Sequence, residues 1–157
     1  MKTDDLRSLH ALRQLREQRA SSQLAAQQQR CRDTHEALDD AKEKLRLHRE
    51  AVARRAENLY GAASEGMTLN AWHAAQEQLD ALADSQQALQ GSVAQSAQAL
   101  QEQEQARDRF RAARLARQRQ AEACESLLEG RLRNERRAGE HREDADEIPT
   151  ALPGGAA

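Results

Sequence analysis

The fold of this chain is decided by residues 24–59, which read in groups of seven LAAQQQR CRDTHEA LDDAKEK LRLHREA VARRAEN L. The first position of every group is apolar: Leu24, Cys31, Leu38, Leu45, Val52 and Leu59. A seven-residue apolar repeat is typical of a helix that packs along a second helix in a left-handed coiled coil. The companion positions, four residues earlier in each case, are mostly polar, so we predict a narrow seam with a closely packed partner.

A second run of helical periodicity supplies that partner. Its heptad positions alternate in steps of three and four without a slip, which is the pattern of a coiled-coil seam, and they are mostly apolar as far as Leu100. They form one row at Trp72, Leu79, Gln86, Val93, Leu100, Arg107, Arg114, Ala121 and Leu128, and a second row at Ala75, Leu82, Leu89, Ser96, Gln103, Phe110, Arg117, Cys124 and Arg131. At the start of the chain, Leu6, Leu9, Leu12 and Leu15 recur every three residues, so we expect the register of the first helix to change there.

The periodicity lapses between the two runs, at residues 60–67, where two glycines lower the helix propensity. Thr68 or Asn70 can cap a new helix after them. In an antiparallel hairpin, the numbers of two facing residues always add to the same sum. With a sum of 131, Leu59 faces Trp72, and the turn between them falls at the glycines.

The predicted fold is therefore all-α, a long two-helix antiparallel coiled-coil hairpin over residues 1–148. Helix 1 is expected at about 4–60, the turn at 61–68 and helix 2 at about 69–138, with a disordered C-terminal tail at 149–157.

The composition agrees with a long hairpin rather than a globular domain. Aromatic residues make up 2% of the chain and charged residues 32%, so there are too few bulky side chains to build a converging core. No proline interrupts the chain between Asp5 and Ile148, which permits very long helices. No apolar run is long enough to span a bilayer and the first residues are acidic, so we expect a cytoplasmic protein.

Signatures of catalysis are missing from the sequence: it contains no glycine-rich phosphate loop, no HExxH and no CxxC. Carboxylates such as Asp39, Asp40 and Glu43 are interpreted as a solvated helix face. Cys31 and His35 stand four residues apart and could form two ligands of a metal site, but without a third ligand the simpler interpretation is a small seam residue beside a surface histidine. We therefore predict no enzyme activity, no cofactor, no metal and no small-molecule substrate.

The first candidate binding surface is the hairpin tip, with Tyr60, Met67, Leu69 and Trp72. Trp72 has two interpretations: it closes the end of the seam, or it joins the other three in an apolar anchor for a partner, since aromatic residues are common interface hot spots.

The second candidate surface is basic and lies at the end of the hairpin that carries the termini. The arginines of helix 2 between positions 107 and 119 fall opposite those of helix 1 under the sum of 131. Like charges in the seam weaken a coiled coil, so this end is predicted to be poorly closed and to dock an acidic or ring-shaped partner. Splaying with local ion pairs, and phosphate binding, remain as alternatives. The candidate residues are Arg13, Arg16, Arg19, Arg107, Arg111, Arg114 and Arg117.

A short stretch after the turn, Met67-Thr68-Leu69-Asn70-Ala71-Trp72-His73, resembles the segment that begins the second helix in type III secretion stalk proteins of the YscO group. The N-terminal residues 6–13 are a looser match. That group is related to the flagellar FliJ protein, and its members are more basic than this chain, whose net charge is −2.

The resemblance implies a cytoplasmic component of a bacterial protein-export machine, peripheral at the inner-membrane secretion apparatus. Its partners would be a hexameric secretion ATPase at the termini end, the cytosolic domain of the export-gate membrane protein at the tip, and secretion chaperones of the translocators. Two alternatives come from other classes of protein: a nucleic-acid-binding helical arm and a purely structural, self-associating coiled coil.

The register leads to a first test, on the two cysteines. With a sum of 131, Cys31 faces Leu100 and Cys124 faces Arg7, so the thiols stand on the order of 36 Å apart along the hairpin. A disulfide needs Cα atoms within about 7 Å. Mass spectrometry after mild oxidation should therefore find no intramolecular Cys31–Cys124 bridge, and its detection would show that the register is wrong.

Overall fold

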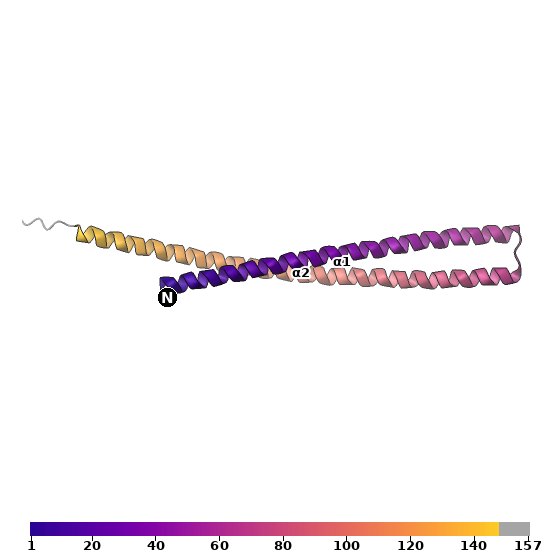
Figure 1. The fold of residues 1–157 in the computed structure, drawn as a ribbon, viewed down its shortest axis with the longest axis horizontal. Coiled ribbons are helices and arrows are strands. Elements are labelled where there is room, and N and C mark those ends of the chain that lie inside the picture. The colour runs from indigo at the N-terminus through magenta and orange to yellow at the C-terminus, as the bar shows by residue number, and fades with distance from the viewer. Residues whose placement is uncertain (148–157) are drawn as a thin grey trace, which may run out of the picture. The chain divides into compact units, whose positions relative to one another are not determined.

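The computed structural model describes residues 1–147, and within them the chain forms two helices, α1 (Thr3–Glu65) and α2 (Leu69–Asp146). The helices run antiparallel and are joined by a short turn (Figure 1). The predicted all-α hairpin is thereby confirmed. The predicted disordered tail, residues 149–157, lies outside the described residues.

The hairpin divides into two compact units. Unit 1 combines Met1–Gln23 with the C-terminal part of the chain from Arg111, and unit 2 comprises Leu24–Phe110. Each unit therefore contains a segment of α1 and a segment of α2.

In unit 2 the predicted row of α1 forms the buried seam. Leu24, Leu38, Leu45 and Leu59 are all buried, and Cys31 is buried with them. Burying a leucine side chain contributes about 1.5–3 kcal/mol, so each leucine of this row stabilises the packing of the unit appreciably. The facing row of α2 is only half-buried, as expected for a pair of helices that cover each other along one stripe.

Contacts across the seam confirm the predicted register. In unit 2, Gln27 bonds to Gln103 and His48 to the carbonyl of Leu82, and each pair of residue numbers adds to 130. In unit 1, Glu17 and Arg114 lie 4.0 Å apart and their numbers add to 131. These three pairs follow the predicted pairing to within one residue, and the long side chain of Arg13 reaches slightly further, to Gln120, with a sum of 133.

The change of register expected at the N-terminal leucines does not occur. The less exposed positions of α1 continue in steps of four and three, from Leu6 through His10, Arg13, Glu17 and Ala20. A step of three residues turns an α-helix by about 300°, so a leucine at every third position moves about 60° around the helix each time.

The exposure of these leucines follows that drift. Leu6 is 8% exposed, Leu9 is half-buried, Leu12 is 43% exposed and Leu15 is 63% exposed. The leucines leave the seam one by one, while polar residues take the inward positions.

The turn is shorter than predicted. Helix α1 continues to Glu65 instead of ending near residue 60, and the turn is residues 66–68 rather than 61–68. Gly61 stays helical because one glycine costs only about 1 kcal/mol between good helix formers such as Ala62 and Ala63. Gly66 ends the helix with a φ of 102° and donates its N–H to the carbonyl of Ala63 at 3.3 Å.

Each helix begins with a side-chain cap. The Thr68 hydroxyl accepts the N–H of Ala71 at 3.2 Å, so Thr68 caps α2, one of the two residues predicted for that role. At the start of α1 the carboxylate of Asp5 reaches back to the N–H of Lys2 at 3.1 Å.

Helix α2 ends at Asp146 rather than near residue 138. Glu135 is the partner of Thr3, so the last turns of α2 continue past the start of α1 (Figure 1). The segment is rich in Arg, Glu and Ala, which favour helix even without a packing partner, and Arg131 lies 3.7 Å from Glu135 one turn later.

The two glycines near the turn should respond in opposite ways to alanine. Gly66→Ala forces an L-residue into positive φ and should lower the free energy of unfolding by about 1–2 kcal/mol. The matched control Gly61→Ala, with open space around its Cβ, should raise it by up to about 1 kcal/mol. Urea denaturation followed by circular dichroism measures both, and equal effects would contradict the assignment of the turn.

Candidate partner-binding surfaces

The basic surface of unit 1 is built by both helices. Arg13 on α1 donates to the backbone carbonyl of Gln120 on α2 at 3.2 Å, and Arg114 on α2 lies 4.0 Å from the carboxylate of Glu17 on α1. These contacts set the α1 and α2 arginines of unit 1 side by side, as predicted. The exposed members of this surface are Arg16, Arg19, Arg111, Arg117 and Arg119.

Arg114 occupies the seam in unit 1, as the heptad predicts. Its Nε is buried without a hydrogen-bond partner, since Glu17 is beyond hydrogen-bond distance. An unsatisfied buried donor costs about 1–3 kcal/mol, which makes this point of the seam weak. The Nδ1 atom of His10 is buried and unsatisfied in the same unit.

The seam assignment of Arg117 is wrong. Its side chain is exposed and donates to Gln120 on the same helix at 3.2 Å. Gln118 takes the half-buried position instead, because the guanidinium of Arg117 is free to turn into water.

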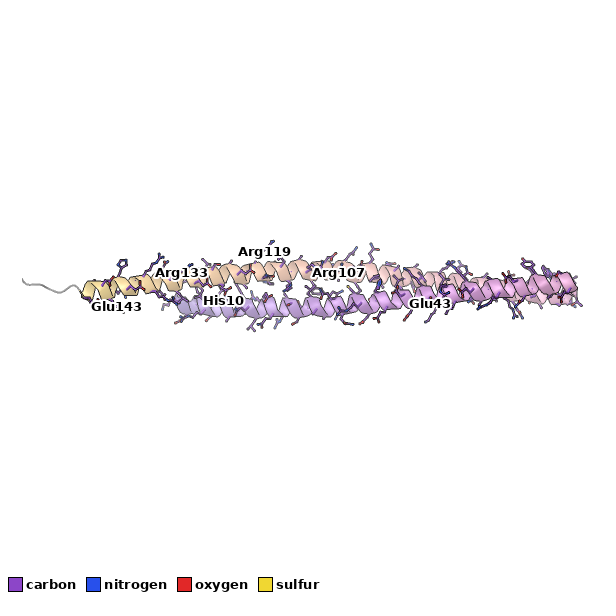
Figure 2. The ribbon with its side chains drawn as sticks, turned by 90° about the horizontal axis from the view of Figure 1, so that it is seen from above. His10, Glu43, Arg107, Arg119, Arg133 and Glu143 are labelled. Carbon is purple, nitrogen blue, oxygen red and sulfur yellow. The ribbon has the colours of Figure 1, made fainter. Side chains whose placement is uncertain are left out.

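Arg107 belongs to unit 2, whereas the other candidate arginines belong to unit 1. It is half-buried, pairs with the adjacent Asp108 at 3.2 Å, and helps to line a hollow of about 320 Å³ with Cys31, His35 and Glu104. Figure 2 shows Arg107 and Arg119 on α2, and His10 on α1.

The tip of the hairpin, in unit 2, brings its predicted aromatic residues together. The rings of Tyr60 and Trp72 lie 6.4 Å apart and are tilted by 54°, a favourable arrangement for an aromatic pair. Trp72 and Met67 are half-buried, whereas Tyr60 is 62% exposed and Leu69 is 69% exposed. Trp72 therefore takes part in the seam and still leaves part of its ring at the surface.

A groove beside the seam of unit 2 was not predicted from the sequence. A hollow of about 430 Å³ is lined by Ala51, Ala81, Leu82 and Ser85 together with Arg55 and Gln78. The signal for it in the sequence is a pair of small residues on α2, Ala81 and Ser85, which stand four residues apart outside the main seam.

Glu43, one of the carboxylates interpreted as a solvated helix face, lies in a surface ion-pair network. Arg46 bonds to Glu43 at 2.6 Å and also to Glu50, and all three side chains are about half exposed. The hydrogen bond from Arg46 lowers the pKa of Glu43 from its ordinary value. A general acid needs the opposite shift, so Glu43 has the character of a solvated ion-pair residue.

The possible metal pair is engaged in other contacts. The Cys31 thiol donates to the carbonyl of Gln103 at 3.2 Å, and His35 lies 3.6 Å from Asp39. Within residues 1–147, no group of three or more His, Cys, Asp or Glu side chains could hold a metal ion. Neither described helix has an apolar stretch of the length and hydropathy that crossing a membrane requires.

Replacing Arg114 tests the weak point of the unit 1 seam. Arg114→Leu should raise the free energy of unfolding by roughly 1 kcal/mol, because it removes an unsatisfied buried donor and restores an apolar heptad position. The control Arg117→Leu changes an exposed side chain and should stay within about 0.5 kcal/mol of the parent. Thermal and urea denaturation measure both, and a loss of stability in Arg114→Leu would show that the contact with Glu17 stabilises the fold.

Comparison with known proteins finds a solved structure of the same fold. The crystal structure of the type III secretion protein YscO from Vibrio parahaemolyticus superimposes with a TM-score of 0.80 at 14% sequence identity, covering 94% of this chain and 94% of that chain. No protein-family model and no curated protein matches the sequence. The resemblance to the YscO group, predicted from residues 67–73, is thus confirmed at the level of the fold.

Proposed function

We propose that this chain is a non-catalytic connector of a bacterial type III protein secretion system that links the cytosolic secretion ATPase to the export gate. The observation that carries the proposal is the fold shared with a type III secretion protein over 94% of both chains. Two surfaces of different chemistry support it: the exposed arginines of unit 1 and the aromatic tip of unit 2.

The arginines of unit 1 suit a docking role at the ATPase. Arg16, Arg19, Arg111, Arg117 and Arg119 are exposed, so they can meet an acidic surface without first breaking a buried contact. The seam beneath them contains buried, unsatisfied polar atoms at His10 and Arg114, which weaken the contact between the helices, and a ring-shaped partner that encloses this end would hold the two helices together.

The aromatic tip suits contact with the cytosolic domain of the export-gate protein, or with chaperones of the translocators. Tyr60 and Leu69 are largely exposed, and they adjoin the partly covered ring of Trp72. Large, rigid side chains of this kind form the energetic centres of protein interfaces. In this proposal the protein works at the cytoplasmic side of the inner membrane.

Nucleic-acid binding through the same arginines is the second candidate. Arginines from two adjacent helices give a continuous basic surface, which is the electrostatic requirement for binding a phosphate backbone. Such binding weakens steeply with added salt and is independent of the ATPase. A duplex titration at two salt concentrations therefore separates it from the first candidate.

The ATPase contact is tested by removing charge from unit 1. The triple variant Arg111→Ala, Arg117→Ala and Arg119→Ala should weaken binding to the assembled secretion ATPase roughly tenfold, mainly by slowing association. The control removes three exposed cations from unit 2, with Lys42→Ala, Lys44→Ala and Arg49→Ala, and should bind as the parent does. Surface plasmon resonance gives both rates; equal weakening by the two triple variants would refute docking through unit 1.

A further inference from the structure

One face of α1 in unit 1 carries two leucines, Leu12 and Leu15, that are exposed to solvent, next to the half-buried Leu9. It consists of Leu9, Leu12 and Leu15, with Asp5 before them and Arg19 after them, and we refer to it as the leucine face. Leu12 is 43% exposed and Leu15 is 63% exposed. The leucines follow one another at every third position, so the face turns gradually around the helix, from the half-buried Leu9 to Leu12 and Leu15, which are directed away from α2.

The inward positions of the same stretch are less apolar than its outward ones. His10, Arg13 and Glu17 occupy the seam toward α2, while Leu12 and Leu15 are directed to solvent. Leu6, earlier in the same helix, is buried in the seam, but Leu12 and Leu15 form an unpartnered apolar surface that favours association.

The leucine face has a symmetry that selects its partner. Leu9 lies three residues before Leu12 and Leu15 lies three residues after it. Asp5 and Arg19 lie seven residues before and after Leu12 in the same way. If two copies of the face pair antiparallel about Leu12, each Leu9 meets a Leu15 and each Asp5 meets an Arg19. Parallel pairing would instead set Asp5 against Asp5 and Arg19 against Arg19, which is repulsive.

The charges at the ends of the face are available for such pairing. Within residues 1–147, Arg19 has no carboxylate within 4.0 Å, and Asp5 forms no ion pair, although one of its oxygens accepts the N–H of Lys2. Both side chains are exposed.

We propose that the leucine face is a self-association surface, on which a second copy of this chain packs antiparallel about a twofold axis at Leu12. Leucine burial drives the pairing, and the two reciprocal Asp5–Arg19 ion pairs set its direction. The contact spans about 15 residues of each helix, on the order of 22 Å. An interface of this size is small, so the dimer forms reversibly as the protein concentration rises.

Analytical ultracentrifugation of the full chain tests self-association. The parent should show a concentration-dependent monomer–dimer equilibrium, and Leu12→Glu should shift its dissociation constant upward by at least about tenfold. The control is Leu115→Glu on α2, which places the same charge at an equally exposed leucine (46%) outside the face and should dimerise as the parent does. A parent that stays monomeric at every concentration, or equal effects of the two variants, would overturn the proposal.

Charge reversal tests the direction of pairing. Arg19→Asp should weaken the dimer, because it sets an acidic residue against Asp5. Adding Asp5→Arg should restore dimerisation, because the reciprocal pair is re-formed with its charges exchanged. A double variant that dimerises no better than Arg19→Asp would show that these residues do not face each other.

Cysteine cross-linking tests the position of the axis. Leu12→Cys places two thiols on the twofold axis and should give a covalent dimer under mild oxidation. Leu15→Cys places them about six residues apart along the helices, roughly 9 Å, which is beyond the reach of a disulfide. The parent chain is the control, because both of its cysteines are buried. Cross-linking of both variants with equal yield would indicate parallel pairing and refute the proposed arrangement.

Discussion

The structure depends on one row of side chains in α1 that is a single residue wide. Leu24, Cys31, Leu38, Leu45 and Leu59 are the buried positions of this seven-residue repeat in unit 2, and its remaining member, Val52, is half-buried. Because the facing row of α2 is only half-buried, the apolar contact can form only if the two helices pack closely.

Close packing also explains the polar contacts across the seam. Gln27 is 2% exposed and donates both to the carbonyl of Gln103 and to its side chain, and the ring of His48 reaches the carbonyl of Leu82 at 2.9 Å. A helix carbonyl keeps a second lone pair after accepting its own N–H, so it can take such a bond from a neighbour. If the register slipped, the buried amide of the glutamine would lose this acceptor, and the slipped pairing would be less stable. Fixing the register in this way is the best-attested role of a polar residue in a coiled-coil seam.

The two surfaces proposed for function arise where the seam departs from this pattern. In unit 1, Arg13, Glu17 and Arg114 occupy inward positions and two buried polar atoms have no partner, so the packing there is weaker than along the leucine row. At the turn, Gly66 ends α1 abruptly and leaves Tyr60 and Leu69 with no further helix to cover them. In both places groups that the hairpin leaves unsatisfied or uncovered become available to other molecules.

The sequence by itself determined the fold class, the direction of the helices and the pairing to within one residue, because a seven-residue repeat and a pair of glycines encode them locally. It did not determine where α1 ends, since the cost of Gly61 is decided by its helical neighbours, or that Arg117 turns outward while Arg114 stays in the seam. From their spacing alone, Leu12 and Leu15 were also predicted to belong to the seam after a change of register. Only the tertiary structure showed the rotation that carries them away from α2, because burial depends on which side of the helix its partner lies.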